Sequence, residues 1–180
     1  GETYESCIRG IEEYFQSGLD GHLSIYPCEI YTNTELASPQ YMDRFGIKTK
    51  KTILTEYHGI PRSANEVNEY REIIIGTDSM PISEWRKALK FSWMVLLIND
   101  MKLGFFILRY IVNRYTIYYT YFIRYICDST ISIFPNSVLS NEIRSFESYT
   151  EDILHGGGQG SILNEYGSFY WSSEEASFLR

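Results

Sequence analysis

Apolar residues recur at helical spacing over the first seventeen positions of the chain. The face that they form consists of Tyr4, Cys7, Ile8, Ile11, Tyr14 and Phe15. Polar residues occupy the opposite face, and Gly18 follows at a position typical of a helix end. The pattern therefore predicts an amphipathic helix over residues 3–17.

Short segments with alternating or β-branched residues follow this helix. They predict strands over residues 22–27, about 50–56 and 72–77. Pro27 ends the first of them, and a short helix between the first two begins at Ser38-Pro39 and ends at Gly46. A helix followed by a strand is half of a repeating α/β unit.

The pattern becomes strongly helical from residue 81 onwards. Helices are predicted over residues 81–102, 105–127 and 137–154. The glycines of 156–160 then predict a helix stop, and aromatic residues around Gly167 predict a small hairpin. Ser172 and Glu175 have the spacing of a capping box, which predicts a last helix. We assign Trp171, just before this box, to packing rather than to ligand binding.

Composition and charge exclude several classes of protein. The chain has 180 residues, of which 44% are hydrophobic, and suits one globular domain or a large piece of a bigger protein. A formal net charge of −7 argues against a nucleic-acid surface and against binding to anionic membranes. Arg109, Arg114 and Arg124 interrupt the most hydrophobic region, so no membrane span is predicted.

Candidate chemistry is sparse. Three cysteines, odd in number and far apart, form no disulfide framework and no metal-binding pair, and they fit a reducing cytoplasm. The three histidines are isolated, and adjacent carboxylates such as Glu12-Glu13 are interpreted as solvated positions or helix caps. Cys28, at the carboxyl end of a predicted strand, is the weak candidate for a reactive group. The alternative, a small buried residue without chemistry, stays open.

Two sets of segments resemble one enzyme family. Gly1-Glu2-Thr3, the helix after it and the segment HLSIYPCEIYTNTEL (22–36) look like the exit of the fifth strand, the fifth helix and the sixth strand of a radical S-adenosylmethionine (SAM) enzyme barrel. The similarity is to the branch with an N-terminal cobalamin-binding domain. Residues 69–93 and 151–179 are similar to the C-terminal extension of that branch.

The resemblance implies a fold and a set of site residues. The fold class would be α/β, with a partial TIM-type βα-barrel remnant over 1–60 followed by a mainly α-helical domain over 61–180. Gly1 and Glu2 would help to shape the SAM pocket, and Tyr26, Pro27 and Cys28 would line its adenine or substrate side. The chain would be a fragment whose family motif begins upstream of Gly1.

The resemblance also implies a function for the longer parent protein. The parent would be a radical SAM, cobalamin-dependent methyltransferase or a related enzyme, acting on an unknown small molecule or peptide. SAM, a 4Fe-4S iron–sulfur cluster and cobalamin would be its cofactors. The cysteines of this chain lie 21 and 99 residues apart and do not match the cluster loop. We therefore expect no cofactor and no metal in this chain alone, which would be inactive without its upstream barrel and cobalamin domain. The alternative is a non-catalytic helical interaction or substrate-docking module.

Overall fold

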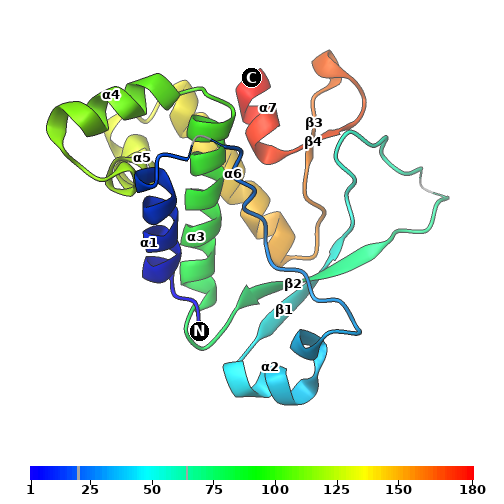
Figure 1. The fold of residues 1–180 in the computed structure, drawn as a ribbon. Helices are drawn as coiled ribbons and strands as arrows, with labels where there is room; N and C mark the ends of the chain where they lie inside the picture. Colours follow the sequence, from blue (N-terminus) through cyan, green and yellow to red (C-terminus); the bar gives the residue numbers. More distant parts are fainter. Residues whose placement is uncertain (20, 64) are drawn as a thin grey trace.

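The computed structural model describes residues 1–19, 21–63 and 65–180. The chain combines a set of helices with two small antiparallel sheets (Figure 1). The helices are α1 (Tyr4–Gln16), α2 (Pro39–Phe45), α3 (Ile82–Val95), α4 (Phe105–Tyr115), α5 (Tyr119–Ile133), α6 (Val138–Leu154) and α7 (Ser173–Leu179). The strands are β1 (Lys48–Ile53), β2 (Tyr70–Gly76), β3 (Ser161–Ile162) and β4 (Tyr170–Trp171). Short 3₁₀ turns lie at Glu35–Ala37 and Asn164–Tyr166.

Most predicted helices are confirmed, and their ends carry the expected caps. The side chains of Thr3, Ser38, Ser137 and Ser172 accept hydrogen bonds from the first turns of α1, α2, α6 and α7. Gly46 ends α2 in the left-handed conformation, at φ 57°. The predicted helix 81–102 is α3 followed by the π-helical turn η2 (Leu96–Asp100).

The single helix predicted over 105–127 is wrong, because the chain breaks between α4 and α5. Thr116 adopts a left-handed conformation at φ 53° and ends α4. The buried carboxylate of Glu12, on α1, then accepts hydrogen bonds from the backbone N–H groups of Tyr119 and Thr120, at 3.4 and 2.8 Å. A residue distant in sequence thus satisfies the first turn of α5.

The strand predicted over 22–27 is also wrong. Residues 22–28 have no regular secondary structure, although Leu23 and Ile25 pack against the helical core. The N–H of Leu23 donates to the Asp100 carboxylate at 2.9 Å instead of to a neighbouring strand. Backbone pairing begins only after Pro27, at Cys28. Asp20, between α1 and this segment, lies outside the described residues.

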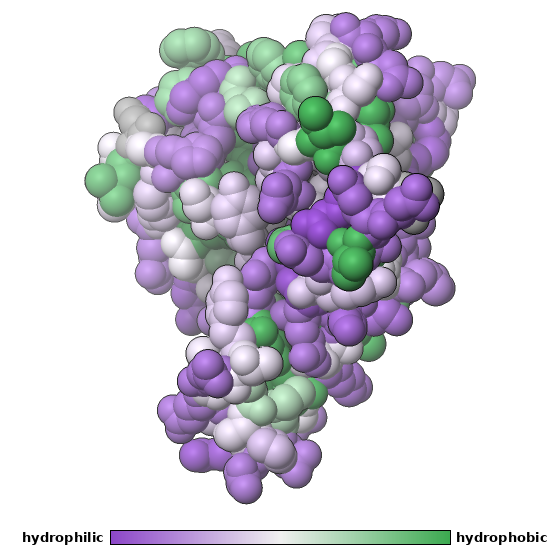
Figure 2. All heavy atoms as spheres, turned by 90° about the vertical axis from the view of Figure 1, so that its right-hand side faces the viewer, coloured by the Kyte–Doolittle hydropathy of each residue, from purple (hydrophilic) through white to green (hydrophobic). Residues whose placement is uncertain are grey.

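The larger sheet pairs β1 with β2, close to the predicted strands 50–56 and 72–77. The two strands are antiparallel and are joined by the long connection 54–69. Residues 28–30 lie along the other edge of β2, where the N–H of Ile74 donates to the Cys28 carbonyl at 2.9 Å and the N–H of Ile30 donates to the Glu72 carbonyl at 2.8 Å. The face of the molecule that is turned to the right in Figure 1 is mainly hydrophilic, with hydrophobic atoms in small separate groups (Figure 2).

The core surrounds α3, which packs against α1, α5 and α6. Its centre includes the fully buried Phe91, and Trp93 stacks on Phe146 of α6 with ring centroids 4.5 Å apart. No single described helix is both long and apolar enough to cross a membrane. The stretch Ile82–Asp100 and α4 have the required length and composition only when taken together, and they are bent by 99° at their junction.

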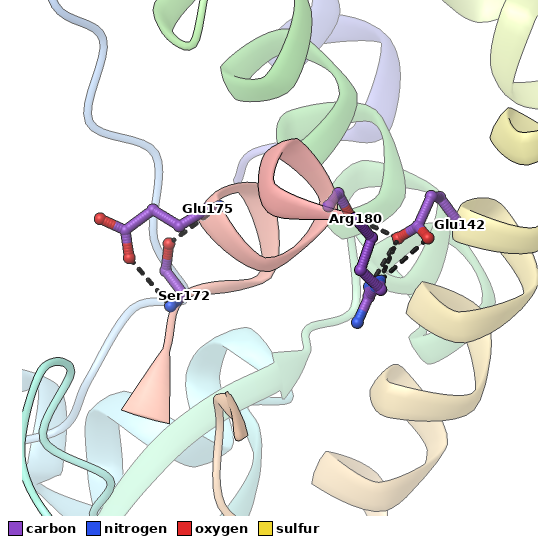
Figure 3. Close-up of polar contacts among 5 residues, drawn as sticks. Glu142, Ser172, Glu175 and Arg180 are labelled. Carbon is purple, nitrogen blue, oxygen red and sulfur yellow. Dashed lines mark hydrogen bonds and ion pairs between the residues drawn. The ribbon is translucent and has the colours of Figure 1, made fainter. Parts of the chain in front are cut away.

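The predicted hairpin and last helix are confirmed at the C-terminal end. β3 pairs with β4, and the capping box of Ser172 and Glu175 opens α7. Figure 3 shows how α7 is held on α6: the guanidinium of Arg180 binds the carboxylate of Glu142, with its Nε 3.0 Å from Oε1. α7 is therefore clamped at its C-terminal end.

Candidate functional site

A cavity of about 610 Å³ opens between the start of α1, the extended residues 25–28, α2, β2 and α3. Its wall is mainly apolar and aromatic. The principal lining residues are Cys7, Ile25, Tyr41, Phe45, Ile47, Ile74, Met80, Trp85, Ala88 and Leu89. Volumes of this size are usual for small-molecule and cofactor sites, which combine an apolar wall with a few polar groups.

The first residues of the chain form one side of this cavity and are held there by Ser79. The Ser79 hydroxyl donates to the Glu2 carbonyl at 2.8 Å, and the Ser6 hydroxyl donates to the Glu2 carboxylate at 2.6 Å. The backbone of Gly1 lies so close to Ser79 that a Cβ atom at this position would be 2.2 Å from the hydroxyl oxygen. Glycine is therefore the residue that fits this close approach.

Residues Tyr26, Pro27 and Cys28 form another side. The pairing of Cys28 with Ile74 holds them beside β2. Tyr26 is 60% exposed, and partial burial followed by the charges of Glu174 and Glu175 raises the pKa of its phenol. The Cys28 side chain is exposed, unlike the small buried residue that was the alternative.

All five residues predicted for the site thus line one cavity. Gly1 and Glu2 come from the start of the chain, whereas Tyr26, Pro27 and Cys28 come from a separate segment. Sequence reasoning did not assign the aromatic wall, which includes Tyr41, Phe45 and Trp85. The sequence did contain a signal for part of the cavity lining. The segment 69–93, which resembles the C-terminal extension of the family, supplies Ile74, Gly76, Met80 and Trp85.

The polar groups of the cavity are few and fixed. The Thr77 and Ser79 hydroxyls lie 3.2 Å apart, and the N–H of Met80 donates to the Thr77 hydroxyl at 3.1 Å. Burial, and to a smaller extent the charge of Glu2, raises the pKa of the Cys7 thiol. Cys7 therefore stays a neutral thiol at neutral pH, and the cavity is suited to binding an amphipathic molecule rather than to nucleophilic attack by Cys7.

The described residues contain no group of three or more His, Cys, Asp or Glu side chains that could hold a metal ion. Cys7 and Cys28 line the cavity, whereas Cys127 is buried in the helical core, where burial raises its pKa to about 12. Thiolates of these three residues therefore do not form the ligand set of an iron–sulfur cluster.

The glycines after α6 serve packing. Gly156, at φ 92°, ends the helix, and the N–H of Gly157 donates to the Asp152 carbonyl at 2.8 Å. A Cβ atom on Gly158 would lie 2.3 Å from the Thr55 hydroxyl. This segment is thus a helix stop pressed against the end of β1, as the sequence predicted.

No protein-family model and no curated protein matches the chain.

Proposed function

We propose that this chain is the carboxyl-terminal portion of a radical SAM enzyme of the cobalamin-binding branch, and that its cavity is part of the ligand pocket. One observation supports the proposal. Five residues that were chosen through sequence resemblance, from two separate segments, line the same cavity of about 610 Å³. In this proposal residues 1–60 belong to the barrel and 61–180 to a C-terminal extension.

The chain's own residues would bind and orient ligands. Gly1 and Glu2 would shape the SAM side of the pocket, because the Glu2 carboxylate is an acceptor for an ammonium group and Gly1 lets the backbone pack against Ser79 at the edge of the cavity. Tyr26, Pro27 and Cys28 would line the adenine or substrate side. The aromatic wall would exclude water from this space. When bound, the cofactors of such enzymes supply radical generation and methyl transfer or rearrangement.

The proposal places the iron–sulfur cluster upstream, in the part of the parent that would carry the three-cysteine loop. The three cysteines described here are free and lie in different elements. Free thiols agree with a reducing, cytoplasmic setting.

The direct experiment compares this chain with the same chain extended upstream through the barrel. Both are reconstituted anaerobically with iron and sulfide, and cluster absorbance and 5′-deoxyadenosine formation are measured. We expect a cluster and 5′-deoxyadenosine from the extended chain and neither from residues 1–180. A stoichiometric cluster with turnover in residues 1–180 would contradict the proposal, as would the absence of both from the extended chain.

A second candidate is a non-catalytic helical docking module, and the outer surface of α4 favours it. Phe106, Ile107 and Tyr110 are 79%, 63% and 66% exposed on this one helix. Exposed apolar side chains that lie together are typical of interaction surfaces. This candidate predicts that the extended chain forms no cluster, so the same reconstitution experiment separates the two functions.

A further inference from the structure

A second, smaller chamber lies next to the main cavity. It has a volume of about 40 Å³, and five residues line both spaces: Ile25, Tyr26, Pro27, Leu89 and Ser92. Its polar lining comes from Tyr57, Trp93, Tyr149, Gln159, Ser173 and Glu174. A single buried water needs about 10–15 Å³, so the chamber has room for a polar group of a few atoms.

Three buried hydrogen-bond donors of this lining have no partner among the described residues. They are the Nε1 of Trp93, the hydroxyl of Tyr149 and the Nε2 of Gln159. Gln159 is only 5% exposed, and its Oε1 accepts a hydrogen bond from Tyr57 at 3.3 Å, which leaves its NH₂ group for another acceptor. Buried donors in proteins are nearly always hydrogen-bonded, so three unpaired donors around one space indicate a missing acceptor.

The charges around the chamber favour a neutral group. Glu174, at the start of α7, lines the chamber, and burial raises the pKa of its carboxyl. A second negative charge beside it would be unfavourable, and a cation would leave the three unpaired donors without an acceptor. A neutral amide offers an N–H to Glu174 and an oxygen to these donors. Arg71, whose positive charge acts on Tyr57 and Tyr149, is paired with Glu29 only through Nη1, 2.6 Å from Oε1, and its Nε and Nη2 are buried and make no regular hydrogen bond among the described residues. The charges of Arg71 and Glu174 therefore oppose each other across this region.

We propose that the chamber binds a carboxamide group of the molecule that occupies the main cavity. The amide oxygen, which has two lone pairs, would accept from the Gln159 NH₂ group and the Tyr149 hydroxyl, and the amide N–H would donate to Glu174. The inference rests on the proposed function in that the main cavity is taken to be a ligand site. A side-chain amide and a backbone amide of a peptide both present this chemistry.

Three probes of nearly equal size test this inference on residues 1–180. They are 3-phenylpropionamide, 3-phenylpropionate and 3-phenylpropylammonium, whose shared phenyl group suits the apolar cavity. Dissociation constants are measured by chemical-shift titration. We expect the amide to bind about tenfold more tightly than either ion, which corresponds to about 1.4 kcal/mol. The N-methylamide extends the test: tighter binding than the primary amide indicates a backbone amide, and weaker binding indicates a side-chain amide, and either supports the chamber as an amide site.

Tyr149→Phe separates binding from folding. The hydroxyl makes no regular hydrogen bond, and its protein contact is a weak one with the Ser173 side chain. The free energy of unfolding should therefore change little, whereas the advantage of the amide over the two ions should shrink about fivefold. Tyr121→Phe, on the exposed face of α5, is the matched control and should change neither quantity.

The binding data distinguish a failure of the amide chamber from a failure of the main cavity as a ligand site. Equal binding of the three probes, or an undiminished amide advantage in Tyr149→Phe, would show a chamber that holds only water, and would overturn this inference while leaving the main cavity as a ligand site. No binding of any probe would overturn both the cavity as a ligand site and the inference that rests on it.

Discussion

The helical core around α3 and the cavity beside β2 differ in how completely their side chains are buried and hydrogen-bonded. In the core, Phe91 is fully buried, and even the buried carboxylate of Glu12 is satisfied by two backbone N–H groups. At the cavity, Tyr41 and Phe45 are only partly buried beside open space, and the adjoining chamber, which meets the core at Trp93, holds unpartnered donors. The difference shows which region stabilises the fold and which is available to a ligand.

The largest expected difference between the regions is in the cost of losing a ring. Phe91→Ala should lower the free energy of unfolding by about 3–5 kcal/mol, because the buried site would keep a void. Tyr41→Ala, in the cavity wall, should cost about 1 kcal/mol, since Tyr41 is only partly buried and already lines an open cavity, so its loss creates no closed void. Urea denaturation of both variants measures this, and equal costs would remove the distinction between core and cavity.

Glu12 and Glu13 are adjacent on α1, but only Glu12 is buried in the core. Glu12→Ala should cost about 2 kcal/mol, because the first N–H groups of α5 lose a charged acceptor. Glu13→Ala is the control, and it should stay within about 0.5 kcal/mol because Glu13 is exposed. Hydrogen exchange at the Thr120 amide should accelerate only in Glu12→Ala. Unchanged exchange there would mean that the contact does not protect α5.

The expected cost of losing the Trp171 ring lies between that of a core ring such as Phe91 and that of a cavity ring such as Tyr41. Its ring is half-buried and contacts Phe169 and His58, with centroids 4.7 and 5.4 Å away, rather than the helical core. The cost of Trp171→Ala should therefore be about 2 kcal/mol, below the roughly 3–5 kcal/mol of a fully buried aromatic residue. Trp171→Phe should recover part of it. A denaturation midpoint equal to that of the parent would mean that these contacts do not stabilise the fold, and would reopen a ligand-binding role.

Periodicity predicted the helices because each one buries a single continuous face. It could not predict the break at Thr116, since the segment has no Gly or Pro and the cap on α5 comes from Glu12, more than a hundred residues away. It also misread Leu23 to Tyr26, because alternating side chains do not determine whether the backbone has a partner strand. Strand pairing begins only at Cys28, and its partner is β2, far downstream in the chain.

The candidate site was predicted in part. Gly1, Glu2, Tyr26, Pro27 and Cys28 were chosen by resemblance, and they meet at one cavity. The small chamber could not be predicted, because its polar lining comes from a loop, two helices, the segment after α6 and the start of α7. Only the folded chain brings these side chains together.

The reactivity of the thiols reports on the central claim, that SAM or the substrate occupies this cavity. Cys28 is exposed at the cavity, whereas burial raises the pKa of the Cys7 thiol and holds that of Cys127 at about 12. Cys28 should therefore be alkylated first, and Cys127 only after unfolding, because the thiolate is the reactive form.

The most direct measurement is the alkylation rate of Cys28 in the cluster-loaded, upstream-extended chain, followed by mass spectrometry of its peptide with and without SAM. We expect saturating SAM to slow Cys28 alkylation severalfold, while the alkylation of Cys127 stays negligible. An unchanged Cys28 rate in a preparation that still forms 5′-deoxyadenosine would contradict it, because SAM would then bind away from this cavity.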